Sequence, residues 1–237
     1  MTGGPWSEPP PGTAGQDGGQ TEWTLADDAV APLVSDLSAL LEDERRGIQH
    51  LAEYFMPGGG YWGGSFERFG QGSHGTDEIG CHDLLSLSLL DAPLPGGAVR
   101  DLVMDSRLRD EVSERLRQID DINLWEASEA SLDSAARLWG LLEGRTEGMG
   151  DTRLSKLLHR KRPHLIPISD SVVRKVLPLP EGVPDRWRGY LAAFRKDPSL
   201  VGRLEGFRRI VASAGHVSPL RVLDVITWMQ GRGDRSL

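Results

Sequence analysis

The sequence has little cysteine or lysine and no long hydrophobic run. Its single cysteine, Cys81, excludes an internal disulfide bond and a four-cysteine iron–sulfur centre. No apolar stretch approaches the roughly 20 residues that a membrane-spanning helix needs, and the glycine- and proline-rich start of the chain has no apolar signal core. We therefore expect a soluble cytoplasmic protein with no membrane partner.

Positive charge is scarce in the first two thirds of the chain. Residues 1–150 contain 10 basic and 27 acidic side chains, whereas residues 151–237 contain 17 basic and 8 acidic ones. The overall charge of −8 argues against a nucleic-acid partner, but the basic C-terminal third favours one. The alternative is that the acidic and basic parts attract each other within the fold.

Hydrophobic periodicity predicts an all-α fold with no alternation of strands and helices. Residues 1–24 have little apolar surface to offset the entropy of ordering, so they predict a disordered tail before a single helical domain at 25–237. In the last helix, Pro219 suits the first position behind a Ser218 cap. The predicted helices span 25–55, 79–90, 97–104, 107–119, 131–143, 152–160, 171–177, 185–196, 200–214 and 219–230.

Residues 56–77 are rich in glycine and aromatic side chains and predict a long loop. A loop with this much aromatic surface is typical of a lid or a pocket wall. The alternative is that its rings fill the core.

Gly148-Met149-Gly150 separates the helices predicted over 131–143 and 152–160. The glycines permit positive φ and close backbone approach, and the methionine can pack between the helices. The free N–H groups at the start of the second helix would suit a phosphate. These features predict a helix-hairpin-helix module at about 131–176.

The helix after the turn carries basic residues on one face. Arg153, Lys156 and Arg160 recur at i, i+3 and i+7, and Lys161 and Arg162 follow them. Such a surface could neutralise several phosphates, so that binding would weaken steeply with salt. By itself the same pattern is also typical of an ordinary solvated helix face.

Asp170 follows an extended crossing that contains Pro163 and Pro167, and it opens a short helix. An aspartate at this place is a good N-cap, so capping alone could explain it.

Residues 138–175 resemble the helix-hairpin-helix DNA glycosylase superfamily, which includes the endonuclease III-like enzymes. There a Gly-apolar-Gly hairpin, a helix and a proline-containing crossing precede an aspartate, which here is Asp170, 22 positions after Gly148. Two positions depart from the family. Thr152 stands where a bifunctional lyase has a nucleophilic lysine, and Leu154 where the family has a small residue. Other stretches, such as KLLHRKRPHLIP, resemble an uncharacterised actinobacterial family that implies no function.

The resemblance implies a monofunctional DNA glycosylase with double-stranded DNA as its partner and a nucleoid-associated location. Asp170 would be the catalytic carboxylate, stabilising charge at C1′ and orienting water. No cofactor is implied apart from a monovalent cation at the hairpin, and the histidines show no zinc-type spacing with Cys81. The expected DNA-binding residues are Gly148, Met149, Gly150, Asp151, Thr152, Arg153, Lys156, Arg160, Lys161 and Arg162, and the candidate base-pocket residues are Tyr61, Trp62, Phe66, Glu67, Trp125 and Trp139.

Two other hypotheses stay open. A non-catalytic DNA-binding protein would keep the hairpin and use Asp170 as a cap alone, with its basic face open. A helical protein unrelated to DNA would pair Arg153, Lys156 and Arg160 with the acidic N-terminal half. The glycosylase hypothesis requires the Asp170 carboxylate to face a cleft that the hairpin also borders.

Overall fold

A computed structural model describes residues 27–72 and 75–233, and every regular element in these ranges is helical, which confirms the all-α prediction. The predicted tail at 1–24 lies outside the described residues. The elements are α1 (Asp27–Glu42), α2 (Glu44–Tyr54), η1 (Trp62–Ser65), α3 (Cys81–Ser86), η2 (Leu87–Leu90), α4 (Gly96–Met104), α5 (Ser106–Arg117), η3 (Leu124–Glu126), α6 (Glu129–Arg145), α7 (Asp151–Lys161), α8 (Val173–Val176), α9 (Val183–Lys196), α10 (Ser199–Ile210), η4 (Ala212–Ala214) and α11 (Pro219–Gly233).

The single helix predicted over 25–55 is wrong, because the chain breaks at Asp43 into α1 and α2. Asp43 leaves the helical conformation at ψ 72°, and its carboxylate accepts a hydrogen bond from the backbone N–H of Arg46. An aspartate that caps a new helix in this way competes with continuation of the old one. Apolar periodicity persists across the break and hides it. At the other end of the chain, Ser218 caps α11 as expected, since its hydroxyl accepts from the Arg221 N–H.

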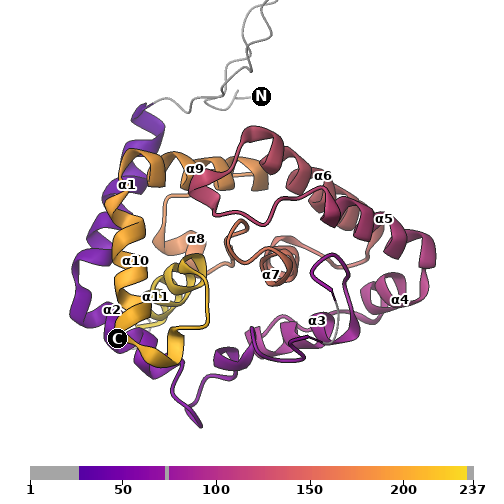
Figure 1. Ribbon diagram of the computed structural model, residues 1–237, viewed down its shortest axis with the longest axis horizontal. Helices are drawn as coiled ribbons and strands as arrows, with labels where there is room; N and C mark the ends of the chain where they lie inside the picture. The colour runs from indigo at the N-terminus through magenta and orange to yellow at the C-terminus, as the bar shows by residue number, and fades with distance from the viewer. Residues whose placement is uncertain (1–26, 73–74, 234–237) are drawn as a thin grey trace, which may run out of the picture.

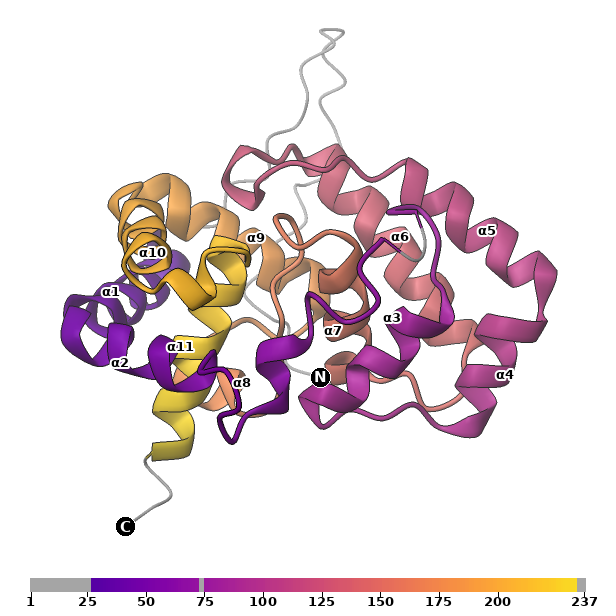
Figure 2. The ribbon, with the colours of Figure 1, turned by 60° about the horizontal axis from the view of Figure 1, so that its bottom comes forward.

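α7 lies near the centre of the molecule, and the other helices surround it (Figure 1). One group consists of α3, α4, α5 and α6. The other contains α1, α2, α8, α10 and α11, in which α11 packs against α2, α8 and α10, while α9 contacts both α1 and α6. Figure 2 shows these two groups side by side, with the segment between α2 and α3 running from one to the other. The connecting segment is the glycine- and aromatic-rich loop.

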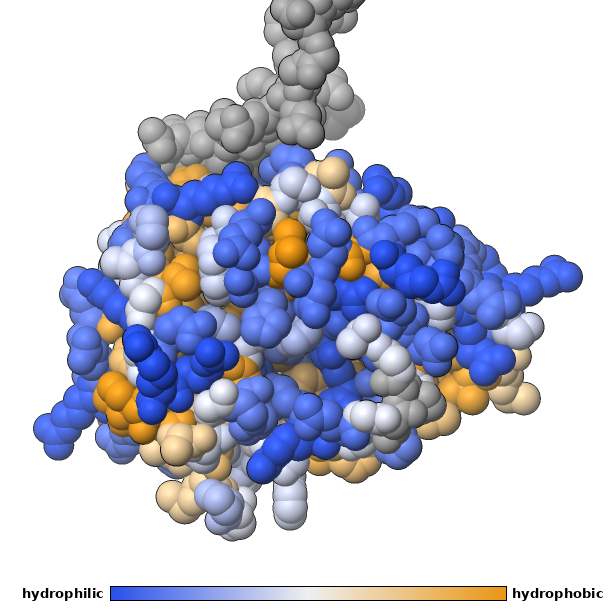
Figure 3. All heavy atoms as spheres, in the orientation of Figure 1, coloured by the Kyte–Doolittle hydropathy of each residue, from blue (hydrophilic) through white to orange (hydrophobic). Residues whose placement is uncertain are grey.

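The core follows from helical periodicity. In α5, for example, Leu108, Val112 and Leu116 are buried at intervals of four residues behind an Asp105 cap. The face of the molecule in Figure 3 is mostly hydrophilic, with hydrophobic side chains in small separate groups. Within the described ranges, none of the helices combines the length and the apolar character needed to cross a membrane.

Candidate functional site

The Gly148-Met149-Gly150 segment forms a tight turn between α6 and α7. Gly148 has φ +75°, and a Cβ atom there would lie 2.7 Å from Cγ of Pro95, so both conformation and space require glycine. Met149 is buried, while the two glycines are exposed. The turn is therefore open to solvent and anchored by one apolar side chain.

Side chains around the first turn of α7 brace this hairpin. Arg153 donates hydrogen bonds to the carbonyls of Pro93 and Gly148, both at 2.9 Å. The Asp151 carboxylate accepts from Arg186 at 2.8 Å and from Arg174 at 3.4 Å. Two expected phosphate contacts, Asp151 and Arg153, thus have intramolecular partners that hold the turn in place.

The basic residues at the other end of α7 are not an open phosphate-binding surface, so that prediction is wrong for Arg160, Lys161 and Arg162. The Lys161 ammonium lies 3.1 Å from Asp83 and donates to the Gly75 carbonyl, and both side chains are buried. Arg160 also pairs with Asp83 and donates to loop carbonyls. Arg162 is buried among carbonyls and Asp77.

Asp83 shows how strongly this end of α7 is paired. Burial opposes ionisation of its carboxyl, but the Gly80 N–H and the charges of Lys161 and Arg160 outweigh burial and lower its pKa. These contacts fasten the glycine- and aromatic-rich loop to α7. The hypothesis of a protein unrelated to DNA anticipated such pairing of Arg160 with the acidic N-terminal half.

Asp170 caps the turn that leads into α8 and also lines a cavity. Its Oδ1 accepts from the backbone N–H groups of Val172 and Val173 at 2.9 and 3.0 Å. Its Oδ2 lies 3.7 Å from Nζ of Lys156, which is buried and donates to the Leu90 carbonyl at 2.8 Å. Lys156 is therefore a neighbour of the candidate catalytic acid rather than a surface phosphate contact.

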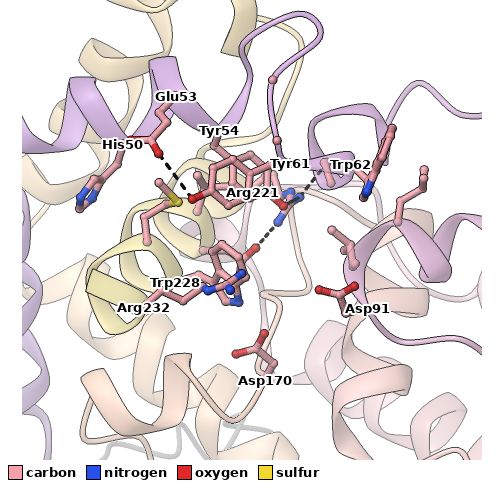
Figure 4. A pocket seen from close by; sticks show the side chains of 18 of the residues that line it. His50, Glu53, Tyr54, Tyr61, Trp62, Asp91, Asp170, Arg221, Trp228 and Arg232 are labelled. Atoms are coloured by element: carbon pink, nitrogen blue, oxygen red, sulfur yellow. Dashed lines mark hydrogen bonds and ion pairs between the residues drawn. The ribbon is translucent and has the colours of Figure 1, made fainter. Parts of the chain in front are cut away.

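The cavity has a volume of about 1090 Å³. Its walls come from α2, the glycine- and aromatic-rich loop, η2, the first half of α7, the segment at Asp170 and Ser171, and α11. Thr152, on the first turn of α7, borders the cavity together with Asp170. The hairpin residues Gly148, Met149 and Gly150 do not line it, so the hairpin itself does not border the cleft as the glycosylase hypothesis required. Figure 4 shows Asp170 at one end of this space and aromatic side chains across it.

An aromatic wall forms the opposite side of the cavity. Tyr54 and Tyr61 stack with ring centroids 5.3 Å apart, and Trp228 meets both rings edge-on. The Arg232 guanidinium covers the Trp228 ring at 4.7 Å. Trp62 also lines the cavity and is 76% exposed, so its indole is free to meet a ligand at the mouth.

Of the six candidate base-pocket residues, two line the cavity and four, including Glu67, do not. Tyr61 and Trp62 line the cavity. Phe66, Trp125 and Trp139 do not: Phe66 is fully buried, Trp125 packs against Phe194, and Trp139 packs against Trp187. Phe66 and Trp139 therefore belong to the core, the half-buried Trp125 packs against it, and the assignment of these three rings to a base pocket is wrong.

Glu67, the remaining candidate, belongs to a buried polar cluster that the sequence did not predict. Arg221 on α11 donates to Glu67 at 2.6 Å, to the Tyr54 hydroxyl at 2.9 Å and to the Gly63 carbonyl at 3.2 Å, and it also pairs with Asp224. Arg221 and Asp224 line the cavity. The available signal was two charged residues at i and i+3 in an otherwise apolar helix, where unpaired burial would be costly.

Burial perturbs several titratable groups around α7. It raises the pKa of Asp224 to about 6, and it raises the pKa of Tyr54. It lowers the pKa of His159, which has its Nδ1 2.6 Å from the Ile166 carbonyl, to about 4. His159 is therefore a neutral core residue, whereas Asp224 is a titratable group in the cavity wall.

Residues 47–231 match the profile of a family of unknown function, DUF6308, and the chain belongs to this family. Neither a curated protein nor a solved structure matches the chain significantly.

Proposed function

We propose that the protein is a monofunctional DNA glycosylase that hydrolyses the N-glycosidic bond of a damaged or modified base, with Asp170 as the catalytic carboxylate. One observation carries the proposal: Asp170 and Thr152, only two residues beyond the Gly148–Gly150 turn, border the same cavity. A strand anchored by its phosphate at the exposed turn would thereby bring its deoxyribose toward that carboxylate. The sequence resemblance supports the same reading of these residues.

The cavity suits an extruded base. A glycosylase must take its target out of the stack, and aromatic side chains compensate for part of the lost stacking. Tyr61, Trp62 and Trp228 supply such surfaces opposite Asp170. With Oδ1 held by the backbone N–H groups of Val172 and Val173, Oδ2 of Asp170 would stabilise the positive charge that develops at C1′ and orient the attacking water.

The basic residues that would contact the DNA phosphates differ from those expected from the sequence. Arg174 and Lys175 on α8 are exposed, and Arg174 lies within 3.4 Å of Asp151 at the start of α7. We assign the phosphate contacts to these two side chains and to the hairpin amides. A monovalent cation at the hairpin stays a prediction, and the Gly148 carbonyl there accepts a hydrogen bond from Arg153.

The experiment compares the wild-type protein with Asp170→Asn and Asp105→Asn. Asp105 caps α5 by the same hydrogen bonds that Asp170 makes to α8, but it does not line the cavity, so it is a matched control for capping. Each protein is incubated with duplexes that contain damaged, alkylated or mismatched bases, and abasic sites are counted after alkaline cleavage. We expect Asp170→Asn to lose at least about 100-fold in base release, with DNA binding and folding retained because asparagine also caps helices.

Three outcomes separate the hypotheses. Equal base release by the wild-type protein and Asp170→Asn would remove Asp170 from the chemistry. DNA binding without base release from any duplex would favour a non-catalytic DNA-binding protein. Failure to bind DNA at low salt would favour a cavity-bearing helical protein unrelated to DNA, the second candidate, which the pairing of Arg160 and Lys161 with Asp83 supports.

A further inference from the structure

The three cations that line the cavity, Lys156, Arg221 and Arg232, differ in their partners. The Lys156 ammonium pairs with Asp170, and the Arg221 guanidinium pairs with Asp224. Within residues 27–72 and 75–233, no ion pair joins Arg232 to a carboxylate. Arg232 is therefore the cation of the cavity wall whose charge is available to an anionic ligand.

The Trp228 ring holds the Arg232 guanidinium in place. The guanidinium carbon lies 4.7 Å from the ring centroid, and the ring itself is fixed edge-on against Tyr54 and Tyr61. Stacking uses the face of the guanidinium and leaves its N–H groups at the edge, where their planar fork matches two oxygens of a phosphate. An arginine held in this way has less rotamer freedom to lose on binding. Arg232 is thus preorganised for a phosphate.

The other charged groups around the cavity do not prevent an anion from binding at Arg232. Two further carboxylates, Glu53 and Asp91, line the cavity, and both are exposed, so that water and salt screen their repulsion. Figure 4 shows Asp91 on the other side of the cavity from Arg232. The Arg46 guanidinium on α2 adds positive charge near the end of α11, since a Cβ atom at Gly233 would lie 3.9 Å from its Nη2.

The end of α11 adjoins the turn that Asp170 caps. A Cβ atom at Gly231 would lie 2.6 Å from Cγ1 of Val172 and 2.8 Å from Cγ2 of Val176. The backbone N–H of Val172 in turn donates to Oδ1 of Asp170. Arg232 directly follows Gly231 and lines the cavity together with Asp170. A nucleotide with its sugar at Asp170 would therefore direct its phosphate toward Arg232.

We propose that Arg232 binds the phosphate of the nucleotide whose base enters the cavity, and that Trp228 positions Arg232 for this contact. The inference rests on the proposed glycosylase function and defines its substrate as a whole nucleotide unit with a charged phosphate beside the target sugar. The cavity volume of about 1090 Å³ lies at the upper end of the range of about 300–1,000 Å³ for small-molecule sites, so it has room for sugar and phosphate besides the base. Arg174 and Lys175 on α8 would bind neighbouring phosphates of the same strand.

The test measures single-turnover base release from duplexes that carry the same target nucleotide. In two of the duplexes, the phosphate on the 5′ or the 3′ side of that nucleotide is replaced by an uncharged methylphosphonate. The proteins are the wild type, Arg232→Gln and a control, Arg107→Gln. Arg107 is exposed on α5 and does not line the cavity, so its substitution removes the same charge away from the site.

We expect Arg232→Gln to release the base about 10- to 100-fold more slowly than the wild-type protein from the unmodified duplex. The methylphosphonate at one of the two positions should slow the wild-type protein and Arg107→Gln by a similar factor. The same methylphosphonate should slow Arg232→Gln by less than about threefold further, because the contact is already lost. Arg107→Gln itself should differ from the wild-type protein by less than about threefold on the unmodified duplex.

The sensitivity to methylphosphonate separates a phosphate contact from a structural role. Arg232 lies in the last turn of α11, where a basic side chain is also favoured by the helix dipole. If Arg232 only stabilised the helix end, Arg232→Gln would remain as sensitive to methylphosphonate as the wild-type protein, and this result would overturn the inference while the proposed function stands. Trp228→Leu should lose the sensitivity and Trp228→Phe should keep it if the ring positions Arg232.

A ligand-binding measurement covers the case in which the wild-type protein releases no base from any duplex. Binding of deoxyadenosine and of its 5′-monophosphate is measured by calorimetry for the wild-type protein and Arg232→Gln. Tighter binding of the monophosphate that disappears in the variant would support the phosphate site, with free nucleotides as its ligands, and would reject the glycosylase. Equal binding of both compounds by the wild-type protein, or no binding, would reject both proposals.

Discussion

The two ends of α7 carry similar basic side chains in opposite surroundings. At its first half, an exposed turn leads to Thr152 and Lys156, which face the cavity beside Asp170. At its last turn, Arg160 and Lys161 hold the glycine- and aromatic-rich loop through Asp83 and backbone carbonyls. One helix therefore supplies a candidate active site at one end and a structural clamp at the other.

The comparison shows that basic residues along one helix face do not by themselves indicate whether they bind a phosphate or pair within the fold. Arg160 lies two turns after Arg153 on the same face, but its guanidinium meets a buried carboxylate and main-chain oxygens. Such a pair is expensive to break because either partner left alone is a buried, uncompensated charge. A basic side chain that is to bind a DNA phosphate must instead stay exposed to solvent in the free protein.

The largest expected effect is a loss of stability when the pairing of Asp83 with Arg160 and Lys161 is removed. Asp83→Ala leaves Arg160 and Lys161 buried without a carboxylate, so the free energy of unfolding should fall by about 3–5 kcal/mol. Urea unfolding measures this loss. The control, Asp101→Ala, removes a pair with an exposed Arg100 and should change stability by less than about 1 kcal/mol. Similar losses in the two variants would contradict the structural role of this end of α7.

The pH dependence of stability should distinguish His159, in the second half of α7, from Asp224 across the cavity. Because the pKa of His159 falls from 6.5 to about 4, the unfolded chain binds the extra proton, and stability is lost as the pH falls through that range. Because the pKa of Asp224 rises from 3.8 to about 6, the folded chain binds the proton there, and stability is lost as the pH rises through that range.

Between about pH 4 and 6, the contributions of His159 and Asp224 to the free energy of unfolding change in opposite directions. Each contribution changes by about 3 kcal/mol over its full range. The wild-type protein should therefore show little change from this pair, whereas Asp224→Asn should lose stability steadily as the pH falls from 6.5 to 4. Urea unfolding at half-unit pH steps gives the comparison. If the difference in stability between the two proteins did not vary with pH, the burial assigned to Asp224 would be untenable.

Alanine substitutions at the two glycines of the turn should differ in their cost to stability. Gly148→Ala has to place a side chain at positive φ and against Pro95, so it should cost about 1–3 kcal/mol. Gly150 has φ −83°, and a Cβ atom there would meet nothing within 4 Å, so Gly150→Ala should change stability by less than about 1 kcal/mol. Thermal unfolding of both variants checks this order. Gly150→Ala is consequently the cleaner probe of DNA binding at the turn.

The smallest effect on stability is expected at α8. Arg174 is exposed and makes a long contact with Asp151, so Arg174→Ala should change the free energy of unfolding by less than about 1 kcal/mol. If Arg174 contacts phosphate, the same substitution should reduce the slope of log K against log salt by about one. An unchanged slope in a fluorescence-anisotropy titration would remove Arg174 from the DNA surface.

The sequence predicted the local features well because they depend on neighbouring residues. Helical periodicity, the Ser218 cap and the turn at Gly148 all follow from interactions within a few positions. The break at Asp43 was missed, although its cause is also local, because apolar residues continue at helical spacing on both sides of it.

The candidate site was predictable in part. The interval from Gly148 to Asp170 predicted that the turn and the acid border one cleft, but Thr152 lines the cavity with Asp170 and residues 148–151 do not. Trp125 and Trp139 could not be separated from Trp62 by sequence, because the same tryptophan side chain can pack against the core or line a pocket, and contacts with distant segments decide which. The partners of Arg221 come from α2, the loop and α11, so that no short motif contains them.

The sequence by itself determined the helices, the positive-φ turn and the capping aspartates, since these depend on backbone conformation and short-range hydrogen bonds. Only the tertiary structure decided which charges are buried and which face the cavity. Burial depends on segments far apart in the chain: Asp83 reaches α7 from 77 positions away, and Glu67 reaches α11 from 154. The desolvation that makes Lys161 a structural residue and Asp224 a titratable one arises only when those segments meet.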